Sequence, residues 1–174
     1  NKKPQHIPFA IGLLGAEGES LPLKLTADDA EAPMDRVLEL TDASHTFEFH
    51  GVSERPVPSL LRGFSAPVRV FYPWTREHLA FLMSHDSDGF NRWDAGQRLA
   101  VDVINSQVAS ADEDLDAGLI EAYRSLLADS SLDQALVAKM LQLPSEAYLI
   151  ELADQPNVPA IHRAREPVLA HLAR

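Results

Sequence analysis

The stretch APVRVFYPWTREHLAFLMSH, residues 66–85, contains the point at which the hydrophobic period of the chain changes. Before Pro73 the apolar residues alternate or form short runs, which is typical of strands. After Pro73 apolar residues recur at helical spacing behind an expected N-cap at Thr75, namely Leu79, Leu82 and Met83. We therefore predict a β-sandwich domain over residues 1–72 and a helical domain over residues 73–174.

Toward the N-terminus, five short runs read as strands: IPFAIGLLG, LPLKL, RVLEL, HTFEFHG and APVRVFY. In the first run alternate residues form one apolar face, and the run LPLKL after a turn is its expected hairpin partner. In HTFEFH, Phe47 and Phe49 alternate with polar residues, so we expect one buried and one wet face. Frequent prolines keep the strands short or at edges. This pattern predicts a small antiparallel sandwich.

The segment RPVPSLLRGFSAPV, residues 55–68, is the most unusual in this half. We interpret it as a proline-stiffened crossing between the last two strands. Arg55 and Arg62 are then expected to be charges at the surface or between domains. Leu60, Leu61 and Phe64 are expected to pack.

Beyond the first helix, HDSDGFNRWDAGQRLA, residues 85–100, predicts a second helix that begins at an Asp88 N-cap. Asn91 and Arg92 should lie away from the core. Trp93 should be a buried anchor within a core-facing stripe that comprises Phe90, Trp93, Ala100, Ile104 and Val108. A calcium loop is disfavoured, because Ala95 stands where the bidentate glutamate is needed.

Further helices are expected over DLDAGLIEAYRSLLAD, SLDQALVAKMLQL and SEAYLIELAD and in the last segment of the chain. In the second of these, Ser131 and Gln134 form a capping-box pattern ahead of an apolar face of Leu136, Met140 and Leu143. Pro167 either kinks the last helix or marks a new first turn. Five or six helices with short connections predict an all-α antiparallel array, a solenoid-like start without a fixed sequence repeat. The expected fold class is therefore α+β in two parts.

The composition excludes several classes of function. The net charge of −11 disfavours nucleic acid as a partner, because an acidic surface repels phosphates. No apolar run is long enough to span a bilayer, so we expect no membrane partner. The absence of cysteine excludes disulfides and thiolate metal sites and fits a reducing compartment. We expect a cytoplasmic protein.

The seven histidines do not form a recognisable catalytic pattern. No His-Glu-x-x-His string occurs, and there is neither a serine nucleophile elbow nor a phosphate-binding glycine loop. His162 and Glu166 have the spacing of an ordinary surface contact on a helix. His45 and His50 would point to opposite faces of a strand. We therefore predict no catalytic, cofactor-binding or metal-binding residue in this chain.

Three long strings together resemble the bacterial aminopeptidase N family, zinc-dependent alanyl aminopeptidases of the gluzincin class. They are HIPFAIGLLGAEGESLPL, LELTDASHTFEFHGVSERPVPSLLRGFSAPVRVFY and LAFLMSHDSDGFNRWDAGQRLA. The resemblance covers residues 5–110 in order and continues more weakly through the later helices. It implies an Ig-like β-sandwich followed by the start of a large C-terminal helical domain. The start at Asn1 and the ending LAHLAR also lead us to expect a piece of a longer polypeptide.

The resemblance carries no site residue over to this chain. The family's zinc-binding and general-base strings, and its Gly-x-Met-Glu-Asn string for the substrate amine, are absent. Tyr72, Tyr123 and Tyr148 lie outside the family's catalytic part, so none is assigned as oxyanion stabiliser. Zinc is expected in the parent enzyme alone.

The expected role is structural: a wedge between the parent's catalytic and helical domains that helps to roof the active-site chamber. The expected partners are the catalytic domain and the rest of the helical domain. Cutting the piece free exposes apolar side chains such as Leu169 and Leu172, so the isolated chain should be able to form a homodimer. The alternative is a free-standing sandwich-helix interaction module without peptidase function.

Overall fold

The computed structural model describes residues 4–110 and 116–172. These residues form two compact units. Residues 1–73 and 85–91 make up the first, which we call the β unit, and residues 74–84 and 92–174 make up the second, the helical unit. The chain therefore leaves the β unit at Pro73 and returns to it at His85.

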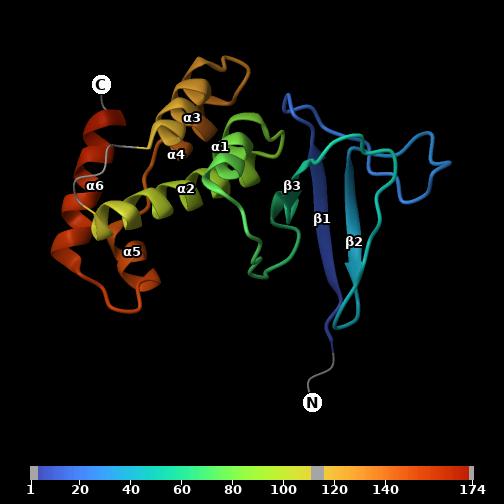
Figure 1. The fold of residues 1–174 in the computed structure, drawn as a ribbon, viewed down its shortest axis with the longest axis horizontal. Coiled ribbons are helices and arrows are strands. Elements are labelled where there is room, and N and C mark those ends of the chain that lie inside the picture. The colour runs from blue at the N-terminus through green and yellow to red at the C-terminus, as the bar shows by residue number, and fades with distance from the viewer. Residues whose placement is uncertain (1–3, 111–115, 173–174) are drawn as a thin grey trace. The chain divides into compact units, whose positions relative to one another are not determined.

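The β unit is built on a three-stranded antiparallel sheet (Figure 1). Its strands are β1 (Ile7–Leu14), β2 (Asp35–Leu40) and β3 (Val57–Leu60), in the order β2-β1-β3. Ile11 at the middle of β1 lies opposite Arg36 on β2 and Leu60 on β3.

One face of the sheet carries the core of the β unit. The alternation of β1 places Ile11 and Leu13 on this face, as the sequence predicts, where they meet Leu23 and Leu38. Phe47 and Phe49 are partly buried against this core, so their predicted inward orientation is confirmed, together with Phe9, Leu21, Val52 and Leu60. Burial of these side chains stabilises the unit by about 25 cal/mol for each Å² of apolar area removed from water.

Two of the five predicted strands are present, and a third strand forms where we expected a crossing. The runs LPLKL, HTFEFHG and APVRVFY are not strands, and the first two meet only in an isolated bridge between Lys24 and His50. VPSL in the proline-rich segment instead pairs with β1. Pro58 is tolerated because β3 lies at the sheet edge, where a missing N–H costs little.

Six α-helices occur among the described residues, in agreement with the predicted array (Figure 1), and a short 3-10 helix spans Arg62–Phe64 in the β unit. They are α1 (Arg76–His85), α2 (Gly89–Ala109), α3 (Ala117–Ala128), α4 (Gln134–Met140), α5 (Glu146–Leu152) and α6 (Val158–Leu172). Pro167 lies inside α6 and does not start a new helix. None of these helices has both the length and the apolarity that crossing a bilayer demands.

The starts of the helices follow the expected cap chemistry with one exception. The Thr75 hydroxyl accepts the His78 backbone N–H at 3.3 Å, and the Asp88 carboxylate accepts that of Asn91 at 2.9 Å. The predicted cap at Ser131 is wrong, because Asp133 caps α4 by accepting two backbone N–H groups, at 2.9 and 3.0 Å. A carboxylate next to the first turn also interacts favourably with the helix dipole.

Arg76 ties the first three helices of the helical unit together. Its guanidinium on α1 pairs with Asp102 on α2 at 2.5 Å and with Asp116 at 3.2 Å. Asp116 is also the N-cap of α3, where it accepts the Leu119 backbone N–H. The hydrogen bond to Asp102 is the largest effect and raises the pKa of Arg76; burial opposes it, and the charge of Asp102 and the hydrogen bond to and charge of Asp116 add to the rise. One side chain thus links three helices at the surface.

Candidate functional site

The histidines do not converge on a metal centre in the described residues. Among residues 4–110 and 116–172, no three His, Asp or Glu side chains come close enough together to hold a metal ion. His45 instead accepts the backbone N–H groups of Thr41 and Asp42, both at 2.9 Å. The described residues therefore show no donor set for the zinc that the resemblance implies for the parent enzyme. That the chain binds no metal stays a prediction, which metal analysis of the purified protein would test.

His162 pairs with a residue of another helix. Its Nδ1 lies 2.7 Å from Glu146 Oε1 at the start of α5, while the predicted neighbour Glu166 adds only a weaker charge effect. The hydrogen bond to Glu146 and its charge raise the pKa of His162. The pair is exposed, so it is a surface contact between α5 and α6.

The strongest concentration of buried polar groups lies in the β unit. We call it the Arg62 cluster: Ser59, Arg62, Asp86 and Asn91 are buried, and the exposed residues Asp35 and Ser87 contact Arg62 at its edge. Arg62 is 8 % exposed and Asp86 is 0 % exposed. The expectation of a surface charge at Arg62 is therefore wrong, whereas the alternative of an interdomain charge agrees with its contact to Asp86, which lies in the part predicted to be helical. Buried charges persist only when they are paired and hydrogen-bonded, and both conditions hold here.

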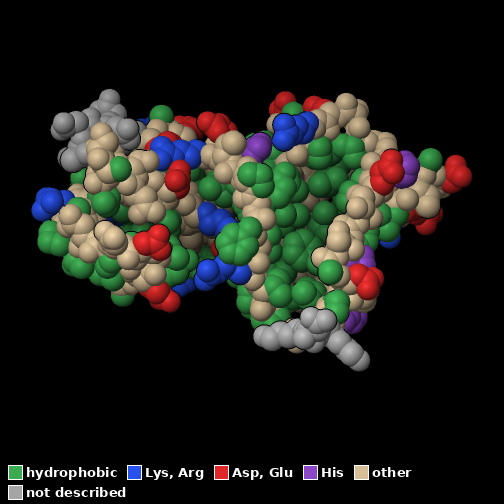
Figure 2. Space-filling model, turned by 60° about the horizontal axis from the view of Figure 1, so that its bottom comes forward, with side chains coloured by type: hydrophobic (Ala, Val, Ile, Leu, Met, Phe, Trp, Pro, Cys, Tyr) green, Lys and Arg blue, Asp and Glu red, His purple; other side chains and the backbone are tan. Residues whose placement is uncertain are grey.

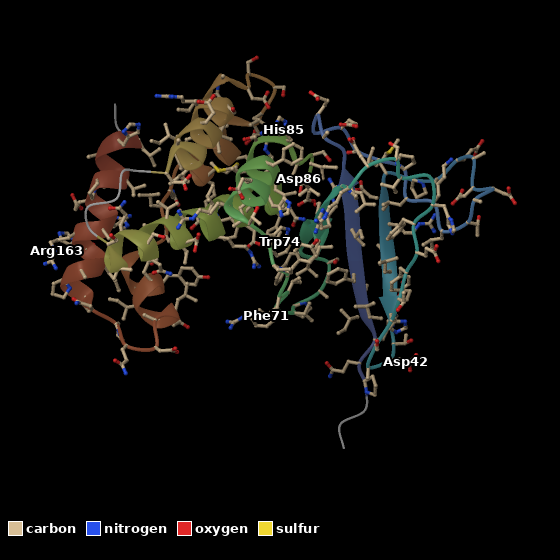
Figure 3. All side chains as sticks on the ribbon, viewed as in Figure 1. Asp42, Phe71, Trp74, His85, Asp86 and Arg163 are labelled. Carbon is tan, nitrogen blue, oxygen red and sulfur yellow. The ribbon has the colours of Figure 1, made fainter. Side chains whose placement is uncertain are left out.

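The Arg62 guanidinium contacts three residues, of which Asp86 is labelled in Figure 3. Its Nη1 lies 2.5 Å from Asp35 Oδ1 on β2, and its Nη2 lies 3.3 Å from Asp86 Oδ1. The same Nη2 donates to the Ser87 hydroxyl at 2.5 Å. The guanidinium thus joins the start of β2 to the turn between α1 and α2.

Gly12 provides the space in which the guanidinium lies. A Cβ at this position would overlap Arg62 Nη1 and would lie 3.1 Å from its Cζ. A side chain at position 12 would therefore displace the Arg62 guanidinium. A glycine inside a strand often marks such a close approach, which is the sequence signal that could have located Arg62.

The backbone around Arg62 is held in an unusual conformation. Leu61 has φ 60° and ψ 41°, and Phe64 has φ 52°, so two non-glycine residues occupy the left-handed region. Such a conformation costs roughly 1–3 kcal/mol per residue and persists only when surrounding contacts impose it. Leu61 is buried as predicted, whereas Phe64 is 52 % exposed, with its ring centroid 5.3 Å from that of Phe90.

Asn91 and Ser59 complete the cluster. Asn91 Nδ2 donates to the Ser59 hydroxyl at 2.7 Å and to the Leu60 carbonyl at 3.0 Å. Burial raises the pKa of Asp86, while hydrogen bonds from Ser59 and Asp88 and the charge of Arg62 oppose that rise. These groups hold one another in place, and they include no activated nucleophile with a neighbouring base.

The predicted orientation of the second helix needs correction. Asn91 and Arg92 are buried, although we expected them away from the core, while Trp93 is only partly buried. Arg92 donates to the carbonyls of Met83 and Ser84 at 3.1 and 2.7 Å, which satisfies the end of α1. Ala100 and Ile104 are buried as predicted.

Apolar side chains are also exposed on both units. Figure 2 shows hydrophobic side chains spread over a broad area of the face of the β unit that is in view. Phe71 is 86 % exposed and projects from the chain in Figure 3. In the helical unit, the exposed large apolar side chains are Leu127, Tyr148, Leu152, Val158 and Leu169.

Comparisons with known proteins match both units. A family of unknown function described as an Ig-like fold, DUF3458, matches residues 1–73, and its companion described as ARM repeats, DUF3458_C, matches residues 76–174. Aminopeptidase N of Escherichia coli K12 is 40 % identical over 99 % of this chain and 20 % of its own length. Aminopeptidase N of Caulobacter vibrioides is 36 % identical over 94 % of this chain and 18 % of its own.

A solved structure agrees in fold. The crystal structure of Legionella pneumophila aminopeptidase A in complex with aspartic acid superposes with a TM-score of 0.81 and 30 % identity. It covers 98 % of this chain, which corresponds to 19 % of that protein. The chain thus spans about a fifth of the length of the relatives it matches.

Proposed function

The chain belongs to the DUF3458_C family, whose ARM-repeat model matches residues 76–174 after an Ig-like part that matches the DUF3458 model, and on this premise we propose a non-catalytic, structural role within an aminopeptidase. One observation carries the proposal: 99 % of the chain aligns with only 20 % of the E. coli aminopeptidase N. The described residues also bring no metal-binding group together. The parent's zinc, peptide hydrolysis and substrates would then depend on residues outside this sequence.

The physical contribution of such a segment is rigidity and shape. The β unit acts as a wedge beside the catalytic domain, and the helical unit contributes part of the roof over the active-site chamber. The exposed apolar side chains support this role, because apolar patches on a protein surface often mark contacts with other protein surfaces. Limiting the chamber to short peptides is the functional consequence that we infer.

A chimera tests the proposal directly. In the E. coli aminopeptidase N, the segment that aligns with this chain is replaced by residues 1–174, and hydrolysis of an aminoacyl chromogenic substrate is measured. We expect a folded, active chimera, whereas the enzyme with the segment deleted should be inactive. A chimera that folds with native zinc content but has no activity would contradict a purely supporting role. A chimera that fails to fold would favour the alternative of a free-standing module.

The same chimera tests the roof. If the helical unit limits entry, substitutions at its exposed apolar residues should change kcat/KM for long peptides more than for dipeptides. An equal change in kcat/KM for long peptides and dipeptides would contradict the proposal that the helical unit limits entry to the chamber.

The isolated chain provides the complementary test. It should bind no zinc in stoichiometric amount and should release no product from the chromogenic substrate. Turnover that a chelator abolishes would show that this chain carries an active site of its own.

A further inference from the structure

We propose that the turn His85–Asn91 is a structural element of the Ig-like β unit and that Arg62 fastens it there. The family boundary places the end of the Ig-like part at residue 73 and the start of the ARM-repeat part at residue 76. By that division the turn belongs to the helical part. The inference is independent of the proposed function, because it concerns only how this chain folds.

The contacts of the turn carry the proposal. Residues 85–91 belong to the β unit, although His85 is the last residue of α1 and residues 89–91 are the first of α2. Asp86 is completely buried, in contact with Arg62, and Asn91 is 7 % exposed, with its side chain bound to Ser59 and the Leu60 carbonyl. The turn thus adds hydrogen bonds to β3 and to the residues that follow it.

Arg62 is the side chain that connects the turn to the rest of the β unit. It reaches Asp86 and Ser87 in the turn and Asp35 on β2, while Gly12 on β1 leaves room for its guanidinium. The left-handed conformations of Leu61 and Phe64 bracket it. Contacts from three separate parts of the β unit therefore converge on one side chain, and strained backbone of this kind is retained only where such contacts impose it.

The consequence is a discontinuous folding unit. The Ig-like part is completed by seven residues that follow it in the chain, after most of α1. Local opening of the turn should then expose the amides of β1 and β3 to solvent as well. The later helices α4, α5 and α6 should not respond, since none of the contacts of the Arg62 cluster involves them.

Hydrogen–deuterium exchange of the full chain, followed by mass spectrometry, tests this coupling. Arg62→Met keeps the aliphatic stem but removes the donors. We expect exchange in peptides that cover β1, β3 and residues 85–91 to rise together, on the order of tenfold or more, because buried partners lose charged hydrogen bonds. Ser59→Ala is the milder variant and should raise exchange in the same peptides by about threefold.

Two controls show whether the effect is specific. Arg124→Met removes an exposed arginine paired with Glu121 at 3.5 Å and should leave exchange in the β unit unchanged. Asp133→Ala should raise exchange in α4 alone, because Asp133 caps that helix.

The proposal is overturned by either of two results. In the first, Arg62→Met or Ser59→Ala accelerates exchange in residues 85–91 but leaves β1 unchanged, so the turn is a mere appendage. In the second, Ser59→Ala accelerates α4–α6 as much as β1, so the effect is global. If Arg62→Met does not fold, the Ser59→Ala result decides by the same two criteria.

Discussion

Gly12 and Arg62 show how one missing side chain determines the place of a charged one. Gly12→Ala should destabilise the β unit by about 1–3 kcal/mol, because the added methyl group overpacks a filled site and displaces the guanidinium. Urea unfolding at constant pH measures this cost. In an Arg62→Ala background the cost of Gly12→Ala should shrink, since no guanidinium is left to collide with. Equal costs in both backgrounds would show that strand conformation at Gly12, and not Arg62, sets the requirement.

Tyr123 presents the opposite situation, a buried polar atom without a described partner. Its side chain is 2 % exposed, its hydroxyl meets no hydrogen-bonding group among the described residues, and burial raises its pKa to about 12. Tyr123→Phe should therefore leave thermal stability unchanged or raise it slightly, because it removes an uncompensated desolvation cost. Tyr123→Ala should cost about 3–5 kcal/mol through the cavity it leaves. A clear loss of stability in the phenylalanine variant would reveal a hydrogen bond to the hydroxyl.

His162 gives the chain a pH response at neutral pH. Because its folded-state pKa lies above the ordinary value of 6.5, the pair with Glu146 stabilises the fold fully below that value. This contribution is lost as pH rises through the raised, folded-state pKa. Glu146→Gln should lower the pKa of His162 in an NMR titration and should reduce the loss of stability between weakly acidic and weakly basic pH. An unchanged titration curve would mean that the pair does not persist in solution.

The roles of residues at helix starts were predictable from the sequence, whereas contacts between residues far apart in the chain were not. Thr75 and Asp88 act as helix caps because an N-cap uses only residues two or three positions away. The burial of Arg62 and Asn91 was missed because their partners are more than 20 residues distant along the chain. Hydrophobic periodicity treats such polar residues as solvent-facing, so it cannot anticipate a buried polar cluster.

At the scale of elements, alternation identified the faces of strands better than it identified their pairing. Ala66, Val68 and Val70 alternate with more exposed residues, as in a strand, yet the segment APVRVFY has no partner strand among the described residues. VPSL pairs with β1 although two prolines lie in or next to it. Side-chain burial depends on what covers a segment, while pairing depends on a free neighbouring edge, and only burial leaves a periodic trace in sequence.

The cap of α4 offers a test at this scale. Asp133→Ala should destabilise the helical unit by about 1 kcal/mol, because two backbone N–H groups lose their acceptor. Ser131→Ala should cost less, since Ser131 bonds to Asp129 and not to the first turn. Thermal unfolding of both variants compares the two positions directly. A larger loss of stability in Ser131→Ala than in Asp133→Ala would support the Ser131 capping box that the sequence alone predicts.

For the molecule as a whole, the order of parts was predictable from the change of hydrophobic period at Pro73. An Ig-like part followed by a helical part is confirmed by the family matches. The return of residues 85–91 to the β unit was not predictable, because it requires contacts between segments that share no local pattern. Family boundaries are drawn as continuous ranges of sequence, so they also miss the return of residues 85–91 to the β unit.

The exposed apolar side chains lead to a prediction about association. We expect sedimentation of the isolated chain to show a dimer whose fraction rises with concentration, because exposed apolar area favours burial. Phe71→Ser and Leu169→Glu, at side chains that are 86 % and 41 % exposed, should shift the equilibrium toward monomer without a loss of thermal stability. A monomer at every concentration would contradict this prediction.

The path of the backbone has a consequence for limited proteolysis. It passes from one unit to the other at three places, after Pro73, after Ser84 and after Asn91. A protease that cleaves only the bond between Pro73 and Trp74 would produce two fragments, the second of which still carries the loop that completes the first. Such a nicked molecule should co-elute as a single species, and the fragments, mixed after denaturation, should reconstitute as a split protein does.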